Sequence, residues 1–117
     1  MDVRKCYEVI EGDYEDVKRR FLSDARIRKF ALLFLKDDSM ANLRAATEAE
    51  DPEKAFYAAH TLKGVCLNLG LTGLYTPVNR ITELLRVGKL KEALLVMPSV
   101  EQAYKVTYEG LEELAQS

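Results

Sequence analysis

His60 is the only histidine in the chain, and it lies in the segment AAHTLKGVCLNLG, residues 58–70. Lys63 and Gly64 follow it by three and four residues, which places both beside it on the next turn of a helix. Histidine has an ordinary pKa of about 6.5, so a neutral imidazole is available near pH 7 as a nucleophile that accepts a phosphoryl group on nitrogen. A lysine ammonium can hold phosphoryl oxygens, and a glycine leaves space for a donor to approach. These residue types at this spacing indicate phosphoryl transfer through His60.

The helix that carries His60 is predicted to run from Pro52 to Leu69. Asp51 is a good N-cap, proline is favoured at the first helical position, and Gly70 is typical of a helix end. At about 100° per residue, one broad arc of this helix is small or apolar: Ala55, Ala58, Ala59, Leu62, Val65, Cys66 and Leu69. His60 falls roughly 140° from the centre of that arc. The imidazole is therefore expected to face solvent, as a functional group or as an idle surface residue, and a core position is disfavoured.

Apolar side chains share the outward face with His60. Phe56, Tyr57 and Leu67 all project near it, and exposed apolar residues around one polar group are typical of a docking surface. Gly64 costs the helix about 1 kcal/mol relative to Ala. It points away from the core arc, so clearance for a partner is favoured over a helix-packing contact.

The rest of the chain also has a helical pattern. Gly and Pro are sparse, and most of them fall where helices should begin or end. A short helix is expected over residues 2–10, ending at Gly12, and Pro77 is expected in the first turn of its helix or at a kink. Further helices are expected over 13–21, 24–37, 39–50 and 72–88, and Asp13, Ser23 and Asp38 are expected to cap the first three of them. A short helix is expected from 89, then a break near Pro98 and a terminal helix. Short connections favour antiparallel neighbours, so the prediction is one domain, residues 1–117, forming an all-α antiparallel up-and-down four-helix bundle with short additional N-terminal helices.

Composition narrows the range of partners. The 17 basic and 19 acidic residues give a net charge of −2, which provides no general reason to bind nucleic acid or an anionic membrane. No signal peptide or membrane span is visible, so a cytoplasmic location is expected. Cys6 and Cys66 are expected to be reduced, buried thiols, and no Cys/His spacing suits a metal. A monomer is expected.

The segment AHTLKGVCLNLG resembles the signature of histidine-containing phosphotransfer (HPt) domains. The matching positions are His60, Leu62, Lys63, Gly64, Asn68 and Gly70. The resemblance implies a phosphorelay intermediate that accepts a phosphoryl group from a receiver aspartate of a response regulator and passes it to another receiver. It implies phosphorylation of His60 on its outer ring nitrogen, stabilisation of the phosphoryl group by Lys63, and clearance at Gly64. Phe56, Tyr57 and Leu67 would then contact the partner.

The resemblance also implies partners and a facing helix. The expected partners are response-regulator receiver domains and a hybrid histidine kinase. Magnesium would be held by the receiver, so no cofactor is expected in this chain. HPt domains often carry a Gln on the helix facing the histidine; here Thr82 stands near that position, and Asn79, one turn away, is the alternative.

Two other functions are considered. The chain could be a helical adaptor that docks onto a signalling partner without moving phosphate. It could also be a fragment of a histidine kinase, but it has no glycine-rich nucleotide-binding loop, so it is not expected to be an autokinase.

Overall fold

The structure is a computed structural model that describes residues 1–117 as seven α-helices, one short 3-10 helix and no strand. The predicted all-α fold class is therefore confirmed. In chain order, the elements are α1 (Val3–Val9), α2 (Tyr14–Phe21), α3 (Asp24–Leu32), the 3-10 helix η1 (Leu33–Lys36), α4 (Ser39–Glu48), α5 (Pro52–Leu69), α6 (Thr72–Arg86) and α7 (Leu90–Ala115).

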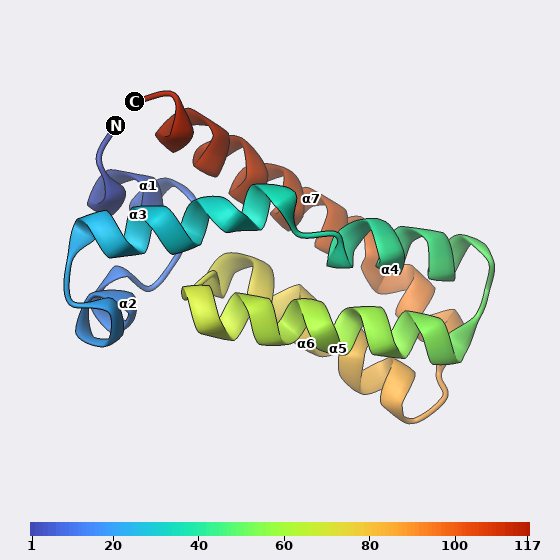
Figure 1. Cartoon of the computed structure of the whole chain (residues 1–117). Helices are drawn as coiled ribbons and strands as arrows, with labels where there is room; N and C mark the ends of the chain where they lie inside the picture. The colour runs from blue at the N-terminus through green and yellow to red at the C-terminus, as the bar shows by residue number, and fades with distance from the viewer.

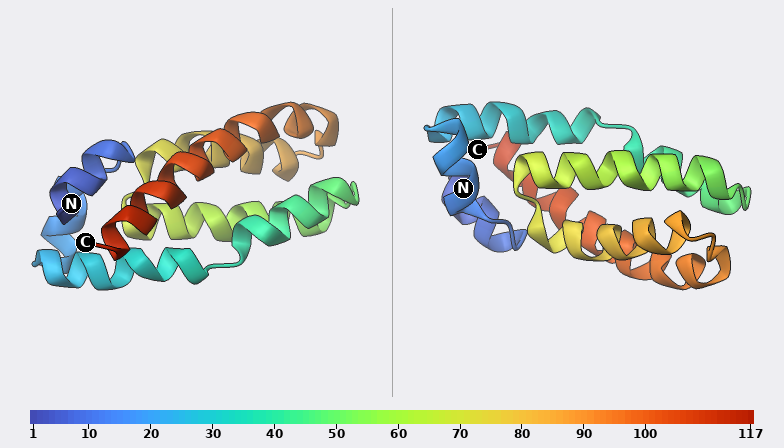
Figure 2. Two further views of the ribbon diagram at one scale, coloured as in Figure 1. Left: turned by 90° about the horizontal axis from the view of Figure 1, so that it is seen from above. Right: turned by 90° about the horizontal axis from the view of Figure 1, so that it is seen from below.

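The helices run back and forth along one long axis, as Figure 1 shows. α3, η1 and α4 follow one another along one side, α5 returns beside α4, α6 runs outward again and α7 returns. α4 packs against α5, α5 against α6 and α6 against α7, giving a body of 40 × 24 × 19 Å. Figure 2 shows α1 and α2 gathered at the end of the molecule where the C-terminus lies. Three of the long bundle segments are single helices, and the fourth is broken between η1 and α4.

Side-chain caps begin several of these helices where the sequence predicts them. The side chains of Asp13, Ser23 and Asp51 each accept a hydrogen bond from the backbone N–H three residues later, at 3.1 to 3.2 Å. Each bond satisfies an amide that has no partner within the helix. Asp38 is the N-cap residue of α4, as predicted, but its side chain makes no capping hydrogen bond. Instead the carboxylate of Asp37, which has an extended backbone, accepts from the N–H of Ser39 at 2.9 Å.

Both internal prolines lie within continuous helices. Pro77 is inside α6, and the predicted break near Pro98 is wrong, because α7 runs through Pro98 for 26 residues. Proline removes one backbone hydrogen bond and crowds the preceding turn. Pro98 is on the exposed side of α7, while Val96 and Val100 on either side are buried in the core. Packing of α7 in the core outweighs the local cost of the proline.

The short N-terminal helices hold the end of α5 in place. The hydroxyl of Tyr7 on α1 donates to the carbonyl of Leu69 at 2.6 Å, and the N–H of Asp13 donates to the carbonyl of Gly70 at 2.9 Å. Gly70 ends α5 with a φ of 64°, a left-handed conformation that glycine adopts at little cost. These contacts set the position from which α6 starts.

The core forms a single apolar cluster between the helices. It contains 27 buried hydrophobic residues, including Cys6 and Cys66, which are both free thiols as predicted. Arg44 on α4 donates three hydrogen bonds, of 2.7 to 3.1 Å, to Glu101 on α7, so an ion pair links these two helices. None of the helices has both the length and the apolar composition needed to cross a membrane.

Candidate functional site

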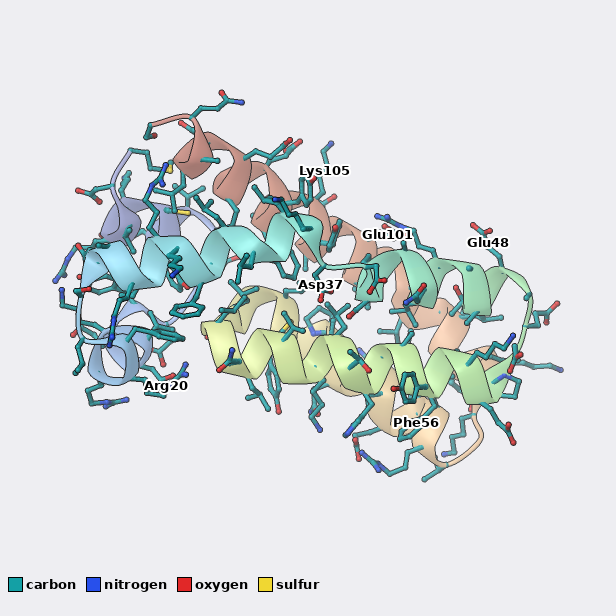
Figure 3. All side chains as sticks on the ribbon, viewed as in Figure 1. Arg20, Asp37, Glu48, Phe56, Glu101 and Lys105 are labelled. Atoms are coloured by element: carbon teal, nitrogen blue, oxygen red, sulfur yellow. The ribbon has the colours of Figure 1, made fainter.

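α5 presents His60 on its outer face. The residue is exposed, whereas the neighbouring Ala59 and Leu62 are completely buried. The rotation predicted from the helical repeat is therefore the observed one for this side chain. Figure 3 labels Phe56, one turn before His60, where α5 lies beside α6.

Lys63 and Gly64 lie on the next turn of the same helix. A β-carbon placed on Gly64 would meet no atom within 4 Å beyond the adjoining backbone of its own helix. Gly64 therefore makes no packing contact that requires a glycine, and it leaves open space beside His60. The Lys63 side chain is only 20% exposed because it leans toward α6, where its Nζ lies 3.6 Å from Oε2 of Glu83.

The three residues expected to contact a partner differ in exposure. Tyr57 is 75% exposed and Leu67 is 55% exposed, while Phe56 is half-buried against the core. The ring of Phe56 stacks against the imidazole of His60, with ring centroids 5.7 Å apart and an angle of 20° between the planes. This contact restricts the imidazole on one side and leaves the Gly64 side open. The result is an apolar rim around a nucleophile that solvent can reach.

Two residues of α6 complete the site, although the sequence pattern did not point to them. The guanidinium of Arg86 lies over the ring of Phe56, with its carbon 5.0 Å from the ring centroid. Arg86 also donates to both carboxylate oxygens of Glu83 at 3.2 to 3.3 Å. The only sequence signal was an acidic residue followed three positions later by a basic one, a pattern common on solvated helix faces. Their placement beside His60 depends on how α6 packs against α5.

Lys63, Glu83 and Arg86 together carry one net positive charge. Lys63 and Arg86 are cations, and the carboxylate of Glu83 lies between them. The hydrogen bonds from Arg86, and then the charges of Arg86 and Lys63, hold the pKa of Glu83 below its ordinary value. The carboxylate is therefore ionised at neutral pH, and it forms ion pairs with both Lys63 and Arg86 in the unphosphorylated protein.

The two residues expected to position the imidazole are placed differently. Thr82 is fully buried, and its hydroxyl donates to the carbonyl of Val78 at 2.7 Å, within its own helix. Asn79 is half-buried on α6. No hydrogen bond joins His60 to either residue in this structure. Contact of either one with a phosphoryl group stays a prediction.

Cys66 lies on the opposite, core-facing side of α5 and belongs to the packing. Burial raises its pKa to about 12, which leaves the thiol protonated and a poor nucleophile. No group of three or more His, Cys, Asp or Glu side chains is arranged to hold a metal ion. The chemistry that this surface offers is therefore that of one exposed imidazole, flanked by a lysine, an open gap and an apolar rim.

The comparisons with known proteins give one positive result. The sequence model of the Hpt domain family matches residues 19–116, which covers α3 to α7 and the end of α2. Comparisons with curated proteins and with solved structures returned no match. Hpt domains are helical bundles that act as histidine phosphotransfer modules in phosphorelays, rather than as kinases, and they work with the receivers and kinases of two-component systems. Since the match extends over most of the chain, this protein belongs to the Hpt domain family.

Proposed function

We propose that this chain is a phosphorelay intermediate in which His60 accepts a phosphoryl group from a receiver aspartate and passes it to the aspartate of another receiver. The observation that carries the proposal is the exposed imidazole with open space at Gly64 and a lysine on the same turn. The family indicates the class of reaction, and the exposure of His60 on α5 supports it as the phosphorylated residue.

The transfer is an in-line displacement at phosphorus. The outer ring nitrogen of His60 forms the new P–N bond while the acyl-phosphate P–O bond breaks, and the receiver regains its free aspartate carboxylate. The other ring nitrogen keeps its proton, so the phosphorylated imidazole shares its positive charge with a negatively charged phosphoryl group. Return of the phosphoryl group to a second aspartate reverses these bond changes.

Each flanking residue has a role in this proposal. Lys63 stabilises the charge on the phosphoryl oxygens, and Gly64 lets the receiver's active site come close enough for in-line transfer. Tyr57 and Leu67, with the exposed edge of Phe56, provide the apolar contacts that dock the receiver. The receiver holds the magnesium ion that this reaction uses, and this chain contributes no metal ligand.

The test is phosphoryl transfer from a receiver carrying radioactive phosphate. Wild type is expected to gain label and to pass it to a second, unlabelled receiver, whereas His60→Gln is expected to gain none. His60 is exposed, so circular dichroism should show an unchanged helical content in the variant. Equal labelling of both proteins would refute the proposal. Receiver binding that survives His60→Ala, with no label on wild type, would identify a docking adaptor instead.

A further inference from the structure

Glu83 is the shared partner of the two cations beside His60. Its Oε2 lies 3.6 Å from the Lys63 ammonium and 3.2 Å from Nη2 of Arg86. Lys63 has no other ion-pair partner in the structure, and Arg86 approaches Glu83 through both Nε and Nη2. Arg86 is itself placed over the ring of Phe56. The carboxylate is thus held in a defined position by an arginine that packs against the residue stacked on His60.

The direction of the Lys63 side chain matters for the phosphoryl group. His60 and Lys63 are one turn apart on α5, so an ammonium directed along α5 could reach phosphoryl oxygens on His60. In the structure the ammonium instead reaches across to α6. Lys63 must leave Glu83, or divide its hydrogen bonds, before it can stabilise phosphorylated His60.

The charges make this a competition. A phosphoryl group carries between one and two negative charges near neutral pH, and it binds a cation more strongly than a carboxylate does. A carboxylate on the same ammonium weakens that binding, because the ion pair must be given up and because like charges repel. Half of the Glu83 side chain is exposed, so solvent screening keeps the penalty small. A small penalty suits a relay, whose phosphoryl group must leave as readily as it arrives.

We propose that Glu83 is a positioning residue that competes with the phosphoryl group for Lys63, and so lowers the stability of phosphorylated His60 and favours onward transfer. The proposal rests on the proposed function only for its last step, transfer to a receiver. The competition itself is a property of the phosphorylated chain and can be measured without a receiver.

The experiment uses the full chain phosphorylated with phosphoramidate, whose P–N bond breaks as the bond to His60 forms and ammonia leaves. Phosphorus NMR then follows the titration of the phosphoryl group itself. A cation bound to the phosphoryl oxygens favours the dianion and lowers the titration midpoint. Glu83→Gln is expected to lower that midpoint by about 0.3 to 0.7 of a pH unit, a two- to fivefold change of the size typical of an exposed ion pair.

Glu53→Gln is the matched control. Glu53 is exposed on the outward face of α5, seven residues before His60, and it is in no ion pair. This variant removes the same charge at a distance of about 10 Å along the helix, where salt screens most of the interaction, so a shift below about 0.1 of a pH unit is expected. Glu83→Gln combined with Lys63→Gln tests the route, because the effect of Glu83 should vanish when Lys63 is absent.

Two outcomes would overturn the proposal: equal shifts for Glu83→Gln and Glu53→Gln, or a Glu83→Gln shift that persists unchanged in the Lys63→Gln background. If receivers fail to label His60 but the shift is present, the proposed function falls and the competition stands. If receivers label His60 but the shift is absent, the proposed function stands and the competition at Lys63 is refuted. If neither phosphoramidate nor a receiver phosphorylates His60, both are refuted.

Discussion

Replacing Gly64 with glutamine should stabilise the protein and slow phosphoryl transfer at the same time. A mid-helix glycine costs about 1 kcal/mol relative to alanine, and glutamine is almost as favourable as alanine. The new side chain would enter open space, since a β-carbon at this position meets nothing within 4 Å beyond its own helix backbone. The free energy of unfolding is therefore expected to rise by about 0.5 to 1 kcal/mol.

The change in melting temperature follows from the size of the chain. With an unfolding entropy of about 2.1 cal/mol/K per residue, 117 residues correspond to about 0.25 kcal/mol/K, so the melting temperature should rise by about 2 to 4 °C. Thermal unfolding followed by circular dichroism measures this. The same side chain would stand beside His60 and hold the receiver's active site away from the ring. A misplacement of about 1 Å can cost on the order of 100-fold in rate, so transfer should slow by at least about tenfold.

Rapid-quench labelling by a phosphorylated receiver measures that rate, and Gly64→Ala should fall between wild type and Gly64→Gln. Gly110→Ala is the contrasting control, because a β-carbon there would collide with Ile10, the residue that follows α1. It should lower the free energy of unfolding by about 1 to 3 kcal/mol and leave the transfer rate unchanged. A Gly64→Gln protein that melts higher but transfers at the wild-type rate would refute the role of clearance. One that melts lower would refute the description of an open position.

Three further predictions concern stability and reactivity. Pro98→Ala should raise the free energy of unfolding in urea by about 1 to 3 kcal/mol, because it restores an amide donor inside a continuous helix; no increase would contradict a helical penalty at Pro98. Cys6 and Cys66, whose pKa values burial raises to about 11 and about 12, should resist iodoacetamide in the folded protein at pH 8 and both react in guanidinium, as counted by mass spectrometry. Hydrogen bonds from Tyr14 and then from Lys18 lower the pKa of Asp24 below its ordinary 3.8. The ionised carboxylate therefore stabilises the fold fully above pH 3.8, and this stabilisation is lost as the pH falls through the lowered pKa. In urea unfolding at a series of acidic pH values, Asp24→Asn should make the free energy of unfolding fall less steeply with decreasing pH, and an unchanged slope would contradict the prediction.

Local sequence signals predicted most of the helix boundaries and the direction of His60. Caps and helix ends depend on the few residues at each terminus, so Ser23, Asp51 and Gly70 could be recognised without knowing the fold. The outward direction of His60 followed from the helical repeat, because small and apolar residues occupy the other side of α5.

Other expectations failed where a tertiary contact opposes a local preference. Pro98 is a strong local signal for a break, yet α7 continues because the buried valines on either side of it pack in the core. The expectation for Thr82 is of another kind: its hydroxyl donates to the carbonyl of Val78 within α6, and contact of Thr82 with a phosphoryl group on His60 stays a prediction. A position on a neighbouring helix can be counted from the sequence only if the rotation and register of the two helices are already known.

The sequence by itself determined that α5 is a capped helix with His60, Lys63 and Gly64 together on its outer face. These features depend on residues within a few turns of one another, and the geometry of a single helix is the same wherever that helix is placed. Only the tertiary structure decided that Glu83 and Arg86 lie beside this face and that Glu83 forms an ion pair with Lys63. Side chains from two helices meet only when packing of the buried residues between them has set their separation, register and rotation.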